Sequence, residues 1–347
     1  VAIVLAPLLR YEGAALSLAA LAVLLWLGHV RAAALTGLAL AVAFGAHAWI
    51  MLRLGLPLFP SSVLLKSGAA AAAHEGDALG GLFMALVGVF RTFREPLGLL
   101  LIATLCASLA ALGTVGPLRK PALLAGMAAI GAHVVAGHYG WFGRYEVYAV
   151  AIALMLLILL WGAWPKEREV KGALQLCGAL LFLGFPSAVY LNKIAADTRA
   201  AARNIYVQQY QMHRFATRYF PHPVAVNDLG WVSYRNDVHV LDLVGLGSEN
   251  VRRLRQAGEY GSRAVAELAR EAGVAYAMVY DEWLAHAIPD PWCRIAELRT
   301  IEVVAASDRV AFYLVDRDLE AEMRAALDAF AQSLPDGPEL RVTSCEA

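Results

Sequence analysis

The chain has 347 residues, of which 59% are hydrophobic and only 17% charged, and its mean hydropathy is +0.56. A soluble domain is usually about 45–50% apolar and about 25% charged, so this composition excludes an ordinary soluble protein and indicates a polytopic membrane protein with a soluble part. Basic and acidic residues balance at 29 each, and neither half carries the basic patch typical of nucleic-acid-binding proteins.

Charged residues are distributed unevenly along the chain. Residues 1–191 carry 12 basic and 7 acidic residues, whereas residues 192–347 carry 17 and 22. This asymmetry predicts a transmembrane domain over residues 1–191, a helical connector over 192–222 and a small α/β domain over 223–347. Because the chain begins at Val1 inside an apolar run, we expect it to be the C-terminal part of a longer protein.

Apolar runs predict the membrane helices. A spanning helix needs about 20 mostly apolar residues, and six segments approach that length. They are Ala14–Leu27, Ala32–Leu52, Leu97–Leu112, Pro121–Ala136, Val147–Trp164 and Gly172–Leu191, with Val1–Leu9 as the end of a truncated seventh. Leu79–Phe90 is shorter, which favours a helix that lies in the membrane interface or re-enters. The predicted fold is therefore an α-helical polytopic membrane domain with about six spanning helices, followed by the α/β domain.

Loop composition predicts the orientation. The short loops Gly116–Lys120 and Pro165–Lys171 hold five basic residues, and the positive-inside rule assigns such loops to the cytoplasm. The segments around residues 10–13, 53–95 and 138–146, and everything after Asn192, then face outward. Several outward segments also carry cations, and binding an anionic ligand would account for them.

The polar half alternates between helical and strand-like patterns. Strands are expected at Val224–Val226, Val238–Leu243, Val274–Tyr280, Ile301–Ala305 and Val310–Val315, and helices at Ser262–Ala272 and Leu319–Phe330. Alternation of this kind predicts a small α/β domain.

Three cations stand at the outward ends of apolar segments. Arg10 lies with Glu12 in Arg10-Tyr11-Glu12-Gly13, Lys66 follows a loop with two prolines, and Arg144 directly precedes an apolar run. Charges at such positions either anchor a helix end or bind a polar ligand. Arg144 is the most informative, because a guanidinium can hold phosphate in bidentate fashion.

Histidine and cysteine add two open questions. His138 could serve in acid–base chemistry, but a single histidine is also a common structural hydrogen-bonding group. Cys106 and Cys177 lie in apolar segments and are expected to be packed thiols, whereas Cys293 and Cys345 could pair in an oxidising compartment. No zinc-type spacing occurs, and no cofactor or metal-ligating residue is assigned; a divalent metal ion stays open, because the sequence carries no pattern that would show one.

These motifs resemble, in their order, those of the GT-C-type polytopic glycosyltransferases of bacterial membranes. Arg10-Tyr11-Glu12-Gly13 is similar to an Arg-Pro-Glu-Gly segment of that family, and Leu58–Lys66 to its Leu-Pro-Asn-Thr-Tyr-Tyr-Ala-Lys loop, without the aromatic residues. Gly143-Arg144-Tyr145 resembles a Tyr-Arg-Phe element. Asn227–Leu246, with Asp228 and Asp242, is similar to an Asp-x-Gly…Ile-Asp-Leu-x-Gly-Leu pattern in the extracytoplasmic domain of one branch.

The resemblance implies transfer of a sugar from a polyprenyl-phosphate-linked donor to a cell-envelope glycan or lipid acceptor, at the outer face of the bacterial inner membrane. Arg10, Lys66 and Arg144 would then bind the donor phosphate and stabilise its developing charge. Glu12, His138 and Tyr145 would support them or bind sugar. Asp228 and Asp242 are expected to be turn or capping residues at strand ends, and the alternative is that they contact the acceptor. The family's catalytic aspartate lies in an early loop, so we expect the general base to precede Val1.

Two other classes of protein remain open. A transporter or flippase for a lipid-linked anion would use the same outward cations, although the chain shows no repeated halves of the kind that transporters often have. A non-catalytic membrane scaffold with an extracytoplasmic binding domain is the third class. That class would tolerate substitution of Arg10, Lys66 and Arg144.

Overall fold

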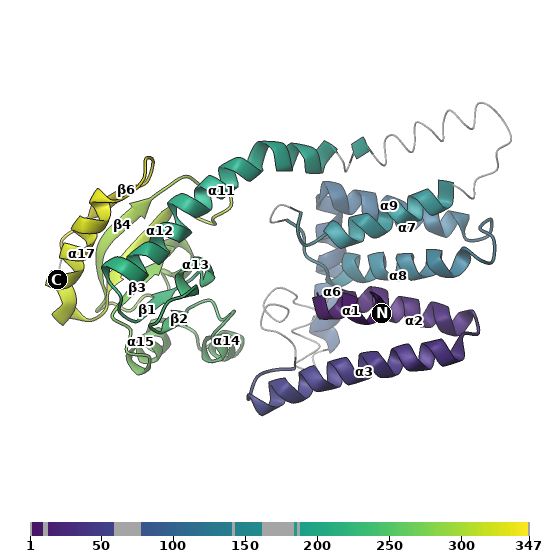
Figure 1. Cartoon of the computed structure of the whole chain (residues 1–347), viewed down its shortest axis with the longest axis horizontal. Coiled ribbons are helices and arrows are strands. Elements are labelled where there is room, and N and C mark those ends of the chain that lie inside the picture. Colours follow the sequence, from purple (N-terminus) through teal and green to yellow (C-terminus); the bar gives the residue numbers. More distant parts are fainter. Residues whose placement is uncertain are drawn as a thin grey trace. The chain divides into compact units, whose positions relative to one another are not determined.

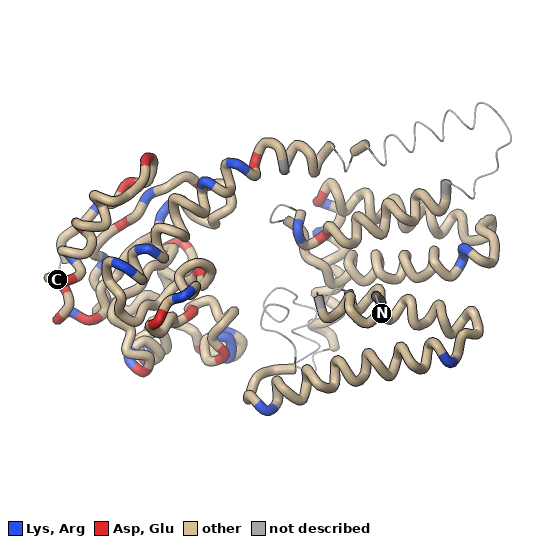
Figure 2. Tube along the Cα trace, in the orientation of Figure 1, with Lys and Arg blue, Asp and Glu red and all other residues tan. Residues whose placement is uncertain are grey.

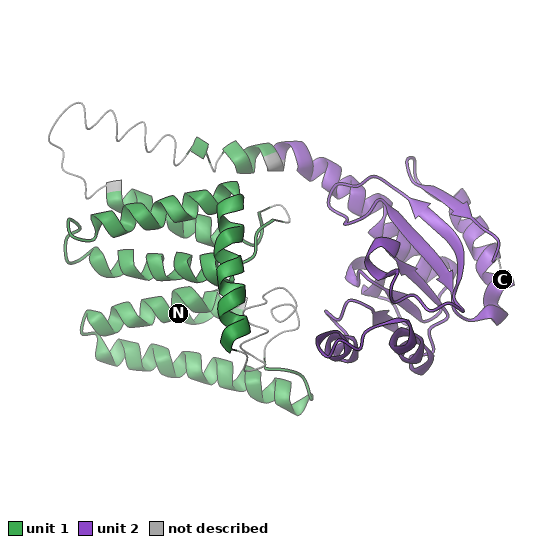
Figure 3. Ribbon diagram, turned by 180° about the vertical axis from the view of Figure 1, so that it is seen from behind, with its two compact units in different colours: residues 1–194 green, residues 195–347 purple. Residues whose placement is uncertain are grey.

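The computed structural model describes residues 2–9, 13–58, 78–140, 143–161, 184–185 and 188–345. It divides the chain into two compact units, residues 1–194 and residues 195–347 (Figures 1 and 3). In the first unit the few charged residues lie mainly at helix ends, whereas in the second they occur throughout (Figure 2).

The first unit is a helical bundle. Its helices are α1 (Ala2–Leu9), α2 (Gly13–Trp26), α3 (Val30–Arg53), α6 (Ala78–Arg94), α7 (Pro96–Ala111), α8 (Lys120–Ala136) and α9 (Val147–Trp161). The core lies between α7, α8 and α9, where Leu101, Leu123 and Ile130 are fully buried. At Gly126 a Cβ atom would lie 2.6 Å from a methyl group of Leu156, so glycine lets α8 and α9 approach closely.

Helix α6 packs through small residues and exposes its large ones. Gly88 and Thr92 are buried against α8: a Cβ on Gly88 would lie 2.2 Å from the Val135 carbonyl oxygen, and the Thr92 hydroxyl donates to the Val134 carbonyl at 3.3 Å. Small residues at helix contacts, with large apolar residues outside, are typical of helices in lipid. The exposed residues recur at helical spacing and are Leu79, Leu82, Phe83, Leu86, Phe90 and Phe93.

The prediction of about six spanning helices is wrong. Within the described ranges, only α3, with 24 residues, is long and apolar enough by itself to cross a membrane. Helices α6 and α7 pass the same test only as a pair, and the pair is bent by 104°.

The apolar runs overestimated the helices because composition does not mark where a helix ends. Helices α2, α8 and α9 contain 14, 17 and 15 residues. At 1.5 Å per residue even the longest measures about 25 Å, which is less than the roughly 30 Å of a hydrocarbon core. Most of the sixth predicted span, Gly172–Leu191, lies outside the described residues. Cys106, expected to be packed, is exposed on α7, and Cys177 is not described.

The second unit is built on a mixed six-stranded sheet in the order β2-β1-β3-β5-β4-β6. Its strands are β1 (Val224–Val226), β2 (Val240–Asp242), β3 (Tyr276–Val279), β4 (Cys293–Arg299), β5 (Arg309–Leu314) and β6 (Glu339–Val342). Strands β2, β1 and β3 are parallel, and β5, β4 and β6 continue the sheet with antiparallel neighbours. All side chains of β1 and β3 are buried, as expected for short strands covered on both faces.

Helices cover both faces of this sheet. One core joins Phe215, Phe312 and Phe330 and lies under α12 (Gln209–Arg214) and α17 (Glu320–Gln332). The other joins Leu241, Val265 and Ala277 and lies under α15 (Ser262–Glu271). The remaining helices of the unit are α11 (Thr198–Val207), α13 (Gly230–Ser233), α14 (Glu249–Gln256) and α16 (Asp281–Leu284), with a π-helical turn at Phe215–Tyr219 and a 3-10 turn at Arg317–Leu319. A further π-helical turn, Lys193–Asp197, includes the boundary between the two units.

Two segments differ from the sequence-based expectation. Residues 301–305, expected as a strand, form a loop because the Asn204 side chain satisfies its backbone: Oδ1 accepts from the amides of Val303, Val304 and Ala305, and Nδ2 donates to the Ile301 carbonyl. The helical segment expected to connect two domains contributes Met212 and Phe215 to the core of the second unit.

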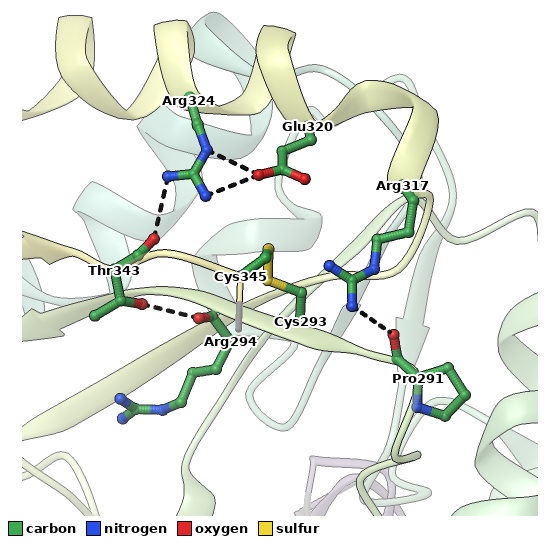
Figure 4. Close-up of a disulfide and its surroundings, with 8 residues drawn as sticks. All are labelled: Pro291, Cys293, Arg294, Arg317, Glu320, Arg324, Thr343 and Cys345. Carbon is green, nitrogen blue, oxygen red and sulfur yellow. Dashed lines mark hydrogen bonds and ion pairs between the residues drawn. A yellow bond between two sulfur atoms is a disulfide. The ribbon is translucent and has the colours of Figure 1, made fainter. Parts of the chain in front are cut away.

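A disulfide joins Cys293, at the start of β4, to Cys345, beyond β6 (Figure 4). The two Cα atoms lie 5.4 Å apart. Nearby, the Arg324 guanidinium bonds Glu320 and the Thr343 carbonyl, while the Thr343 hydroxyl donates to the Arg294 carbonyl at 2.8 Å. The C-terminal strand is thus fastened to both α17 and β4.

Candidate functional site

The best-supported candidate site in the first unit is the loop between α8 and α9. Helix α8 ends where Gly137 leaves the helical conformation, and two further glycines, Gly140 and Gly143, adopt positive φ angles of 100° and 72°. Side chains rarely accept these angles, so glycine makes the tight path possible. The loop then delivers Arg144 and Tyr145 immediately before the first turn of α9.

Arg144, Tyr145 and His138 form one cluster. The exposed Arg144 guanidinium lies over the Tyr145 ring at 4.9 Å, and its Nη2 donates to the Tyr145 hydroxyl at 2.9 Å. The His138 ring meets the Tyr145 ring edge to face at 5.1 Å. Three residues predicted from sequence are therefore in contact, and stacking fixes where the guanidinium lies.

A second guanidinium joins the cluster from α6. Nη1 of Arg91 lies 3.1 Å from Nδ1 of His138. Because a guanidinium can only donate, this contact is a hydrogen bond in the tautomer of His138 that carries its proton on Nε2. The contact joins the loop between α8 and α9 to the last turn of α6.

Arg91 was not among the sequence-predicted site residues. It occurs in the last turn of α6, next to the exposed apolar stripe, so its interfacial depth could have been inferred from spacing. Its contact with His138, 47 residues away in the chain, could not.

Hydrogen bonds between buried polar groups fix the loop between α8 and α9. The Thr92 hydroxyl lies 2.9 Å from the Tyr139 hydroxyl, and burial raises the pKa of Tyr139 to about 12 against the opposing effect of that hydrogen bond. Glu146 is 3% exposed and accepts a bond from the Gly140 amide at 3.2 Å. These contacts fix the loop backbone, so the cluster above them is preorganised.

The other predicted donor-site residues, Arg10, Glu12 and Lys66, lie outside the described residues. Of the cations predicted to bind donor phosphate, Arg144 alone can be placed. The described ranges contain no group of three or more His, Cys, Asp or Glu side chains that could hold a metal ion.

The two predicted aspartates lie in the second unit, at the carboxyl ends of parallel strands. Asp242 is 3% exposed, and its carboxylate accepts from the amides of Val244, Gly245 and Gly247 at 2.8, 3.1 and 2.6 Å. Asp228 is half-buried; burial raises its pKa and the nearby Asp242 adds to this, while a hydrogen bond from Gln209 opposes it. Asp242 thus fixes the backbone of its own loop. The carboxyl group of Asp228 is only partly buried and can still be reached from the surface.

Comparison with known proteins concerns the second unit. Residues 203–313 match a family model described as a domain of unknown function, DUF8728. This segment runs from α11 to β5 and includes Asp228 and Asp242. No curated protein and no solved structure matches the chain. The match carries no assigned activity, so function has to be argued from the two sites themselves.

Proposed function

We propose that this chain belongs to a membrane glycosyltransferase, which moves a sugar from a polyprenyl-phosphate-linked donor to a cell-envelope glycan or lipid acceptor outside the cytoplasm. The observation that carries the proposal is the exposed Arg144 guanidinium, stacked on Tyr145 beside the Arg91–His138 pair. One guanidinium group and an imidazole from the loop, together with a second guanidinium group from α6, suit an anionic phosphate.

The chemistry of transfer needs such a cluster. When an acceptor hydroxyl attacks the anomeric carbon, the bond to the polyprenyl phosphate breaks and the phosphate gains negative charge. Positioned guanidinium groups stabilise that charge without having to reorganise. Arg144 and Arg91 fit this role, and His138, which contacts both Arg91 and Tyr145, helps to position them. The reaction also needs a general base that takes the proton of the acceptor hydroxyl. The resemblance assigns this base to a segment before Val1.

Two further features support a membrane protein with an extracytoplasmic second unit. Helix α3 is long enough to anchor the chain, and α6 exposes a stripe of leucine and phenylalanine. The Cys293–Cys345 disulfide favours an oxidising compartment, because thiols in the cytosol are usually kept reduced.

The first test measures binding of polyprenyl phosphate itself, the leaving group common to every such donor. With the full chain in detergent micelles, we expect Arg144→Ala to weaken binding at least tenfold and Arg144→Lys to restore only part of it, since lysine lacks the planar fork. Arg119→Ala is the matched control, because Arg119 is also exposed but precedes the opposite end of α8.

The second test measures activity in the full-length protein. Transfer from polyprenyl-phosphate-linked hexoses and pentoses to a membrane acceptor fraction should collapse in Arg144→Ala and persist in Arg119→Ala. If Arg144→Ala binds polyprenyl phosphate and transfers sugar as the wild type does, the loop between α8 and α9 is not part of the donor site. If polyprenyl phosphate moves across vesicles while no sugar is transferred, the chain is a flippase instead.

A further inference from the structure

The second unit carries a ladder of aromatic rings that the proposed donor site does not use. Within it, Tyr206 and Tyr210 stack at 5.5 Å, Tyr210 meets Trp231 edge to face at 5.4 Å, and Trp231 meets Tyr234 at 5.6 Å. His213 lies between Tyr210, Trp231 and Tyr234. Tyr206, Trp231 and Tyr234 are 49%, 40% and 51% exposed. We call these five rings the aromatic ladder.

Exposed rings of this size need an explanation. An isolated exposed aromatic residue is unremarkable, but contiguous rings on helices α11, α12 and α13 form a patch. Next to it, Arg235 has a φ of 46°, the one positive φ of a non-glycine residue among those described, and its guanidinium lies over the Tyr234 ring at 5.3 Å. Backbone strain of this kind concentrates at functional sites.

The ladder adjoins the carboxyl ends of β1 and β3. From β1 the chain leaves towards β2 on one side, and after β3 it leaves towards the opposite side of the sheet. Ligands of open sheets commonly bind where connections diverge in this way. Asp228 follows β1 here and accepts a hydrogen bond from Gln209, the neighbour of Tyr210.

Two buried amide groups at this edge have open hydrogen-bonding capacity. Asn227 is 4% exposed; its Oδ1 accepts from the Tyr280 amide, while its Nδ2 has no partner in the described chain. Gln209 is 5% exposed, and its Oε1 likewise has no partner among the described residues. A buried polar atom normally has a partner, so this edge of the sheet holds one donor and one acceptor that the described chain leaves without a hydrogen bond.

The chemistry of this face selects the class of ligand. A hydroxyl group both donates and accepts, which matches an open donor, an open acceptor and a carboxyl group. Asp228 and Asp242 repel a phosphate or carboxylate at the strand ends. Among the described residues, the one cation placed against the ladder rings, Arg235, lies over Tyr234 and not beside Asp228. Aromatic rings offer flat apolar area beside these polar groups.

We infer that the aromatic ladder together with Asp228 forms a binding site for a neutral carbohydrate chain, whose sugar rings lie against Tyr210 and Trp231 and whose hydroxyls bond Asp228. The site stands on its own geometry. Its identification as the acceptor-binding site of the transferase rests on the proposed function.

The test uses the full chain in detergent micelles, titrated with neutral pentasaccharides of mannose, galactose and arabinose. At least one of the three should bind, and Trp231→Ala and Asp228→Asn should each weaken that binding at least tenfold. Trp231→Phe should keep most of it, because a ring remains. Asp308→Asn, which changes an exposed carboxylate outside the ladder, should bind as wild type does.

Thermal unfolding of each variant shows whether it is folded. Because Trp231 is exposed, we expect its variants to fold. No binding by any of the three pentasaccharides in the millimolar range, or unchanged binding in both Trp231→Ala and Asp228→Asn, would overturn the inference. Binding to vesicles of anionic lipid in place of the sugars would also overturn it, in favour of a membrane-docking face. Polyprenyl phosphate binding separates the two proposals: it should fall in Arg144→Ala and persist in the ladder variants.

Discussion

At the scale of single residues, Asp228 and Asp242 show how neighbouring carboxyl groups can differ in role. Asp242 ends β2 and Asp228 follows β1, which are parallel strands, and a sequence pattern gives the two residues equal weight. The carboxylate of Asp242 accepts hydrogen bonds from three backbone amides of its own loop. Asp228 accepts one from the side chain of Gln209 and one from the backbone of Gly230. Hydrogen-bond satisfaction, which depends on the folded loop, separates the structural residue from the candidate binding residue.

Asp228 should make the second unit less stable as pH rises. Burial raises its pKa in the folded state, so the folded form holds the proton more tightly than the unfolded chain. The associated stability is fully present below the ordinary pKa of about 3.9 and is lost as pH rises through the raised value. Asp228→Asn removes the titrating group and with it this loss. The unfolding temperature of the variant minus that of the wild type should therefore increase from pH 4 to pH 8. A difference that does not change with pH would contradict this account.

At the scale of elements, the contact of α6 with α8 depends on one glycine. A Cβ on Gly88 would lie 2.2 Å from the Val135 carbonyl oxygen and 3.0 Å from its carbon, which are backbone atoms that cannot rotate away. Gly88→Ala should therefore push the helices apart and cost about 1–3 kcal/mol, the usual range for overpacking.

Gly81→Ala is the matched control, because a Cβ at Gly81 of the same helix meets no atom within 4 Å. Size-exclusion profiles after heating in detergent would report both variants. We expect Gly88→Ala to aggregate at a lower temperature than wild type, and Gly81→Ala to match or exceed wild type since alanine favours a helix. Equal behaviour of the two variants would mean that α6 does not pack on α8 in this way.

The disulfide acts on strand β6, an edge strand whose residues are mostly exposed. Cys345→Ser should destabilise the second unit by about 2–4 kcal/mol, the usual value for a natural disulfide. Cys106→Ser, which alters an exposed free thiol, should leave the unfolding temperature unchanged. Labelling by maleimide before and after reduction would count the thiols, and a Cys293 that reacts without reduction would show that the bond is absent.

At the scale of the whole molecule, the proposal assigns the second unit to the side opposite the cytoplasm. Protease added to intact spheroplasts should then digest residues 195–347 while leaving part of the first unit protected, detectable with a tag at either end. A cytoplasmic marker protein has to survive the same treatment. Protection of the second unit until the cells are lysed would reverse this orientation and remove the support that the disulfide lends.

Much of the organisation follows from local sequence. The contrast in charge between residues 1–191 and 192–347 separates an apolar part from a polar one, because each residue's preference for water is its own property. Strands β1 and β3 and helices α15 and α17 were likewise expected near their observed positions, since periodicity is local. Strand β4, which carries three charged residues in seven, and helix α14 have weaker patterns and were not expected.

The tertiary structure alone decided what depends on residues distant in sequence. Arg91 reaches His138 only because α6 packs on α8, and the 301–305 segment is a loop only because Asn204 binds its amides. The lengths of the apolar helices could not be predicted from the sequence either. A helix ends where its chain turns to pack, and an apolar run can continue past that point. Composition thus determined that the chain has an apolar part and a sheet-forming part, and packing decided which polar groups meet in each.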